Sequence, residues 1–181
     1  HLSRGVTMIK FETNLKDEAQ QHFNDLQVCR DLLEGQVQQR AFSATDLYAY
    51  VYGAENSALK QALVFNLNLR RAYKGMLKGA ASYKIGYAQA ASSTDYPERH
   101  VDGCRLRVHS SNAEAQQLYL ILEFRDKNIP LPEQLVIFDD QERMETFDLP
   151  QGRNGVIQAL IERQSLIADL LKSPKTEIFL R

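Results

Sequence analysis

The residue types of a cysteine hydrolase occur together in the pentapeptide His-Val-Asp-Gly-Cys. It contains His100, Asp102 and Cys104, and a thiol close to an imidazole and a carboxylate can act as a nucleophile. The spacing weakens this interpretation, because alternate residues of a strand lie in one line and a cysteine that begins an apolar strand is usually part of the core. A hydrolase centred on Cys104 and His100 is therefore the least favoured interpretation of the function.

Metal and phosphate chemistry have no recognisable motif in the chain. His100, Cys104 and His109 could converge on an ion, but the sequence has no His-x-x-x-His or Cys-x-x-Cys spacing. The acidic segment 139–145 lacks the glycine and the alternating oxygen ligands of a calcium loop, and it indicates a hairpin turn instead. Glycine-rich phosphate-binding motifs are also absent. The sequence therefore predicts no metal, no cofactor and no enzymatic activity.

The composition is that of an ordinary globular protein. The chain has 181 residues, of which 44% are hydrophobic, and a formal net charge of −1, so it can bury a core in one domain or in two small lobes. No apolar run approaches the roughly 18 residues of a membrane-spanning helix. Cys29 and Cys104 show neither a Cys-x-x-Cys spacing nor a secretory context, which predicts reduced thiols in a cytoplasmic protein. Residues 1–13 are expected to be a leader, in part vector-derived.

The first half of the chain has the apolar spacing of amphipathic helices. Residues 15–35 repeat apolar side chains at intervals of three and four. A second, short helix is expected to begin at Ser43 or Thr45 and to end at Gly53. A third helix is expected over residues 57–79, and its first half is apolar nearly all round, which is typical of the centre of a helical bundle.

Three tyrosines lie in the short second helix. Tyr48, Tyr50 and Tyr52 point to different faces at about 100° per residue, so they cannot all be in the core. At least one of them is therefore expected to show its ring to solvent or to a partner. The alternative is that all three lie half-buried with their hydroxyls outward.

The third helix carries a stripe of basic residues. Arg70, Lys74 and Lys78 repeat every four residues with Arg71 beside them, and the segment 57–93 contains no acidic residue. Such a stripe is usually a solvated helix face. It can also contact an acidic protein surface or neutralise the phosphates of a nucleic acid. Four cations are few for a nucleic-acid-binding surface, and the net charge of the chain is −1.

The second half of the chain has the patterns of antiparallel strands. Residues 104–109 alternate, a polar turn follows, and residues 117–124 form a nearly unbroken apolar run that is expected to be buried on both faces. Residues 88–103 are interpreted as a linker, because glycine and proline interrupt the helical pattern. The predicted fold is α+β, with an N-terminal helical bundle in residues 1–93 and a small antiparallel β-sandwich or open barrel in residues 104–181.

Shorter elements complete the predicted β-rich lobe. Two strands around the turn at 139–143 are expected to form a second hairpin, after two prolines that prevent central strand pairing. Residues 155–162 are expected to be a strand rather than a short helix. Ser165 should cap a short helix, and residues 176–180 should form the last of five or six strands.

Residues 46–77 combine the tyrosine-rich helix with a longer helix that contains Leu-Arg-Arg-Ala-Tyr-Lys-Gly-Met-Leu. This segment resembles the N-terminal helical domain of bacterial anti-sigma factors, in which an acidic residue, Leu, Ala, an aromatic residue and Gly begin a small bundle that clamps a sigma factor. Many members bind zinc through a histidine and a Cys-x-x-Cys pair. Here no histidine lies between His22 and His100, and no cysteine between Cys29 and Cys104. The resemblance is therefore to a zinc-less variant, and it implies a transcription regulator that binds a protein partner.

These patterns together predict a non-enzymatic protein-interaction module whose helical lobe binds another protein. The partner-binding residues are expected in the second and third helices: Asp46, Tyr48, Tyr52, Arg70, Arg71 and Lys74. The alternative is a nucleic-acid-binding protein that uses the basic stripe of the third helix. No membrane association is expected, and the sequence leaves the identity of the partner and the oligomeric state open.

Overall fold

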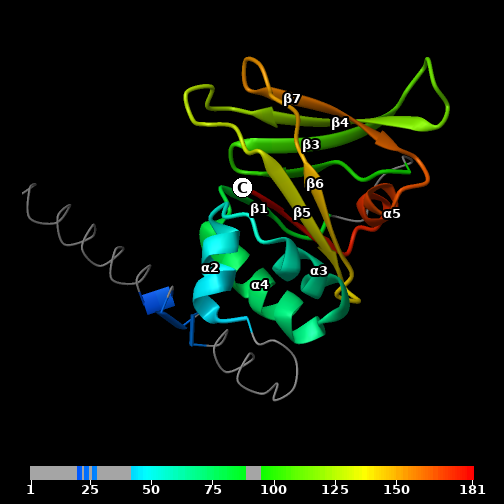
Figure 1. Ribbon diagram of the computed structural model, residues 1–181. Helices are drawn as coiled ribbons and strands as arrows, with labels where there is room; N and C mark the ends of the chain where they lie inside the picture. Colours follow the sequence, from blue (N-terminus) through cyan, green and yellow to red (C-terminus); the bar gives the residue numbers. More distant parts are fainter. Residues whose placement is uncertain (1–19, 22, 25, 28–41, 89–94) are drawn as a thin grey trace, which may run out of the picture. The chain divides into compact units, whose positions relative to one another are not determined.

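Figure 1 shows the computed structural model of the chain, which describes residues 20–21, 23–24, 26–27, 42–88 and 95–181. The predicted leader and most of the first predicted helix lie outside these ranges. The chain divides into two compact units, His1–Ala80 and Ala81–Arg181.

Helices and antiparallel sheets are both present, so the predicted α+β class is confirmed. The described residues contain four helices, α2 to α5, and two four-stranded sheets. None of the helices in the described ranges is long and apolar enough to cross a membrane.

The first unit is helical in the residues that the structure describes. Its helices are α2 (Ala44–Val51), α3 (Ser57–Phe65) and α4 (Leu67–Ala80), and α4 contacts both of the others. The rings of Tyr50 and Tyr73 lie 5.6 Å apart and join α2 to α4. Apolar residues at helical spacing supply the other buried side chains: Leu47, Val51, Leu59, Leu63, Leu69, Ala72, Met76 and Leu77.

The predicted third helix is two helices with a break at Asn66. Asn66 has an extended backbone, with φ −109° and ψ 105°. Its N–H donates to the Ala62 carbonyl at 2.9 Å and ends α3, while its side-chain oxygen accepts from the Leu69 N–H at 3.0 Å and begins α4. An asparagine side chain competes for backbone groups in this way, which favours helix ends over helix interiors. The prediction of one continuous helix over residues 57–79 is therefore wrong.

The second unit contains two antiparallel sheets and one helix. The β5 sheet has the order β1-β8-β5-β6, with β1 (Tyr83–Ile85), β8 (Thr176–Leu180), β5 (Gln134–Asp139) and β6 (Met144–Asp148). The β4 sheet has the order β2-β3-β4-β7, with β2 (Arg99–Val101), β3 (Cys104–Ser110), β4 (Gln117–Phe124) and β7 (Val156–Glu162). Helix α5 (Leu166–Lys172) begins at Ser165, as predicted, and both predicted hairpins are confirmed.

Both sheets contribute to one hydrophobic core. Its residues come from the β4 sheet, the β5 sheet and α5, and include Leu106, Leu120, Leu122, Leu135, Ile137, Ile178, Leu180, Ile167 and Leu170. Along β4, buried residues alternate with half-buried ones, so the prediction that this strand is buried on both faces is wrong. The outward-facing residue Ile121 lies opposite Arg107 in the pairing with β3, and both residues are half-buried.

The strands β1 and β2 were not predicted from the sequence. β2 lies within residues 88–103, which the sequence assigned to a linker, and it pairs with β3 so that Arg99 is opposite Leu106. Both strands contain only three residues, too few for a periodic pattern, and they form because a longer strand offers hydrogen-bonding groups beside them. The second compact unit begins in the sequence at Ala81, so both strands belong to it.

A buried arginine joins three segments of the second unit. Arg99 extends from β2 and is 2% exposed. Its Nη1 donates to the Thr176 carbonyl at 3.1 Å, and its Nη2 donates to the Thr176 hydroxyl at 2.7 Å and to the Ser173 carbonyl at 2.5 Å. Ser173 ends α5 and Thr176 begins β8, so one side chain links β2, α5 and β8. Desolvation lowers the pKa of Arg99 to about 10, which still leaves its guanidinium protonated at neutral pH.

Candidate interaction site

Asp46 has a structural role at the start of α2. The Ser43 hydroxyl accepts from the Asp46 N–H at 3.1 Å, and the Asp46 carboxylate accepts from the N–H and the hydroxyl of Ser43 at 2.9 and 2.8 Å. The two residues form a capping box. The pKa of Asp46 is lowered mainly by the hydrogen bond from the Ser43 N–H and, to a smaller extent, by the one from the Ser43 hydroxyl. The capping box therefore stabilises the fold at neutral pH, and this stabilisation is lost as the pH falls through the pKa of Asp46. This capping role explains why an acidic residue is found at position 46, and no binding to another protein is needed to explain it.

Tyr48 and Tyr52 form an exposed aromatic pair on α2. Their ring centroids lie 4.5 Å apart, and the two residues are 42% and 52% exposed. Tyr50, between them in the sequence, is buried, so the prediction that at least one tyrosine shows its ring is confirmed and the alternative of three half-buried rings is wrong. The pKa of Tyr52 is raised mainly by partial burial and, to a smaller extent, by the neighbouring Tyr48. Its hydroxyl is therefore a neutral hydrogen-bond donor at physiological pH.

Arg70 caps α3 instead of extending from the basic stripe. Its Nη1 donates to the carbonyls of Leu63 and Val64 at 2.9 and 2.8 Å. These carbonyls are in the last turn of α3, where the helix supplies no partner, and a cation there interacts favourably with the helix dipole. The sequence grouped Arg70 with the partner-binding residues because the prediction of a single helix hid this helix end.

Arg71, Lys74 and Lys78 lie in one row on α4 together with Leu67. Their spacings of four, three and four residues place them on the same helix face. Arg71 and Lys78 are exposed, and Lys74 is half-buried. Since neither α3 nor α4 contains an acidic residue, this row gives the helical unit a positively charged face.

Three apolar residues around the α3–α4 break are exposed, and we call them the junction patch. Val64, Phe65 and Leu67 are 62%, 88% and 38% exposed. The sequence placed the first half of the predicted third helix at the centre of a bundle, and for Val64 and Phe65 that prediction is wrong. The apolar run itself does not indicate which residues face outward. The polar residue within it, Asn66, was the available signal that a helix ends there.

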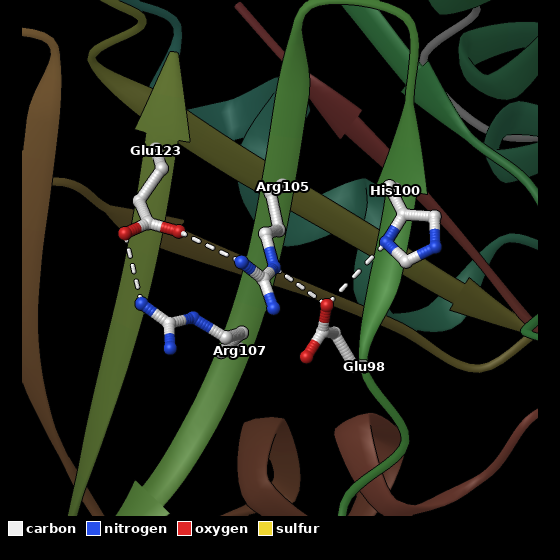
Figure 2. A network of polar contacts seen from close by, with 5 residues as sticks. All are labelled: Glu98, His100, Arg105, Arg107 and Glu123. Carbon is white, nitrogen blue, oxygen red and sulfur yellow. Dashed lines mark hydrogen bonds and ion pairs between the residues drawn. The ribbon is translucent and has the colours of Figure 1, made fainter. Parts of the chain in front are cut away.

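A second group of polar side chains lies on the outer face of the β4 sheet (Figure 2). Arg105 donates to Glu98 at 2.5 Å and lies 3.9 Å from Glu123, which also accepts from Arg107 at 2.8 Å. The imidazole of His100 lies 3.5 Å from Glu98. The Arg105 hydrogen bond lowers the pKa of Glu98. Four of these five residues, all except Arg107, line part of an open depression of about 480 Å³.

The contacts within the group on the β4 sheet follow from strand pairing. Each carboxylate is bound by an arginine, and Arg105 is directly opposite Glu123 in the β3–β4 pairing, which is a stabilising cross-strand arrangement. Exposed ion pairs of this kind contribute little to stability, because solvent screens the charges. The sequence did not reveal the group, because its members come from β2 and the residue before it, from β3 and from β4, and they meet only through the strand register.

Cys104 and His100 both line the open depression, but the burial of the thiol disfavours a catalytic pair. Cys104 is buried in the core, and burial raises the pKa of its thiol to about 12, so it is not a nucleophile at neutral pH. His100 is exposed and pairs in register with Arg105, the residue that follows Cys104 and lies on the outer face. This geometry gives no support to the hydrolase interpretation.

Neither a metal site nor a relative points to another function. In the ranges that the structure describes, no group of three or more His, Cys, Asp or Glu side chains is placed to bind a metal ion. No family model, curated protein or solved structure matches this chain. Exposed aromatic, apolar and basic residues of the helical unit remain as the candidate interaction surface.

Proposed function

We propose that the chain is a non-enzymatic protein-interaction module whose helical unit binds another protein. The observation that carries this proposal is the exposed pair Tyr48 and Tyr52 on α2. Tyrosine is enriched in protein interfaces, because its ring supplies a large rigid contact area at low entropic cost and its hydroxyl supplies a hydrogen bond. Two adjacent rings that are exposed in the isolated chain gain burial when a partner covers them.

The basic residues of the same unit indicate that the partner is acidic. Arg71 and Lys74 lie on α4, which contacts α2. Charges at the rim of an interface steer the encounter of two proteins and exclude partners of like charge. The partner-binding residues are therefore Tyr48, Tyr52, Arg71 and Lys74, while Asp46 and Arg70 hold the ends of the helices.

Nucleic-acid binding is the alternative, and two observations disfavour it. Arg70 binds two carbonyls at the end of α3, and the three other cations of the stripe, Arg71, Lys74 and Lys78, would neutralise few phosphates. The exposed apolar residues of α3 and α4 would not contribute to phosphate binding, but they do fit a protein surface.

We also infer the finer architecture that goes with this function. The helical residues within 1–93 form an N-terminal binding domain. The two sheets, which include β1 and β2 before residue 104, form a sandwich together with α5. The core shared by both sheets supports the sandwich. The resemblance of residues 46–77 to anti-sigma factors supports one specific form of the function, a cytoplasmic regulator that binds a sigma factor.

Affinity capture from the native host, with the full chain as bait, tests the proposal. Replacing both Tyr48 and Tyr52 with serine should lower the recovery of the bound protein about tenfold or more. The reason is that each aromatic ring lost from the centre of an interface weakens binding by about 1 kcal/mol or more. Recovery is measured by quantitative mass spectrometry.

The matched control replaces Val156 and Leu160 with serine. These residues of β7 are also exposed, and the change should leave recovery unaltered. Circular dichroism should show that both double variants remain folded, because substitutions of exposed residues usually change stability by about 0.5 kcal/mol or less. An equal loss of recovery in both variants, or capture of nucleic acid without protein, would contradict the proposed function.

A further inference from the structure

The junction patch has a cation one helical turn away on each side. Lys60 precedes Val64 by four residues on α3, and Arg71 follows Leu67 by four residues on α4. Residues at this spacing share a helix face. Phe65 lies between the two pairs in the sequence and is the most exposed large hydrophobic residue in the part of the chain that the structure describes. On each of the two helices, a cation therefore shares the helix face of an exposed apolar residue of the junction patch.

The junction patch is held on a fixed backbone. The Asn66 side chain accepts a hydrogen bond at the start of α4, and Arg70 donates to two carbonyls at the end of α3. Both helix ends at the junction are therefore capped. A surface that is already ordered loses little conformational entropy on binding. Contiguous exposed apolar side chains are uncommon on a monomer unless they take part in binding.

We propose that the junction patch docks an acidic amphipathic helix of the partner protein. This inference rests on the proposed function and specifies the chemistry of its partner. The apolar stripe of the docked helix covers Val64, Phe65 and Leu67, and its acidic side chains approach Lys60 and Arg71.

Charge complementarity selects this occupant. Neither α3 nor α4 has an acidic residue, so a basic helix is repelled and an acidic one is attracted. A helix can present an apolar stripe at positions i, i+3, i+4 and i+7 with acidic residues on both flanks. That arrangement complements exposed apolar residues that share their helix faces with cations.

The test uses the full chain and a designed probe. The probe is a fluorescein-labelled synthetic peptide of about 16 residues with leucine in the apolar stripe and glutamate on the flanks, and fluorescence anisotropy measures its affinity. Phe65→Ser should weaken binding about tenfold or more, as expected for a central aromatic residue of an interface. Phe23→Ser is the matched control, because Phe23 is also exposed, at 62%, and its replacement should leave the affinity unchanged.

The contribution of charge is tested with a second set of variants. The double change Lys60→Glu and Arg71→Glu should weaken binding about tenfold at low salt and much less at high salt, because salt screens exposed charges. Lys175→Glu, at an exposed position of the second unit, should have no effect. A peptide of the same composition in scrambled order should not bind.

Several outcomes would overturn the docking proposal. They are equal binding of the designed and scrambled peptides, an affinity that Phe65→Ser leaves unchanged, and displacement of the peptide by a random oligonucleotide that binds more tightly.

The proposed function can fail separately from the docking proposal. If the peptide does not bind while capture of the native partner still depends on Tyr48 and Tyr52, the docking proposal alone is wrong. If the peptide binds through Phe65 and capture is independent of the tyrosines, the docking site stands and the tyrosine site is wrong.

Discussion

Replacing Arg99 with methionine should lower the free energy of unfolding by about 3 kcal/mol or more, measured by chemical denaturation. Methionine fills similar space but donates no hydrogen bond, so the carbonyls of Ser173 and Thr176 lose a charged donor. Hydrogen bonds to a charged group contribute about 1.5 to 3 kcal/mol each, and a buried acceptor left without a partner adds a further cost. Arg99→Lys should rescue only part of the loss, because an ammonium group lacks the planar fork that reaches several acceptors.

Arg125→Met is the control for Arg99. Arg125 also binds an oxygen, that of Asp102 at 3.0 Å, but both side chains are largely exposed. An exposed ion pair contributes at most about 1 kcal/mol, so this variant should remain close to the native stability. Buried charges are in some proteins replaced by apolar residues without loss. An Arg99→Met protein as stable as the native one would therefore show that Arg99 does not hold β2, α5 and β8 together.

Gly155→Ala should destabilise the protein by about 2 to 3 kcal/mol. Gly155 has φ +75°, and a Cβ atom there would lie 2.8 Å from the carbonyl oxygen of Phe124. The Phe124 N–H also donates to the Gly155 carbonyl at 2.7 Å, so the two backbones cannot separate without losing a hydrogen bond. Positive φ costs a residue with a side chain about 1 to 2 kcal/mol, and overpacking typically costs about 1 to 3 kcal/mol. Thermal or chemical unfolding measures the change.

Gly86→Ala is the matched glycine control. A Cβ atom at Gly86 would meet nothing within 4 Å, and its φ lies outside the left-handed region. Alanine there should be neutral or should stabilise the protein by about 0.5 kcal/mol, because it restricts the unfolded chain. Equal stability of the Gly155→Ala and Gly86→Ala proteins would show that the turn before β7 relaxes freely.

The sequence predicted the elements that have a long regular pattern. The alternation in β3, the turns of both hairpins and the cap at Ser165 depend on neighbouring residues, and all appear in the structure. β1 is set by pairing with β8, far along the sequence, which a local pattern does not contain. β2 forms a tight hairpin with β3 across Asp102 and Gly103, and its three residues are too few to show an alternating pattern. The break at Asn66 depends on one side chain, whose hydrogen bonds outweigh the apolar pattern around it.

The candidate site was predictable in part. The sequence identified Tyr48 and Tyr52, because three tyrosines at successive even positions cannot all face one core. It did not show the exposure of Phe65, since an apolar residue in an apolar helix is expected to be buried. The structural roles of Asp46 and Arg70 depend on helix ends that only the three-dimensional structure reveals.

Site-specific photo-crosslinking in the native host tests most directly whether the helical unit binds a protein partner. A photoreactive phenylalanine derivative is placed at Tyr52, at Phe65 or at Leu160, which are all exposed. We expect covalent adducts with the same protein from positions 52 and 65, and no adduct from position 160 on β7. Adducts from position 160 alone, or adducts of equal yield from all three positions, would contradict partner binding through the helical unit.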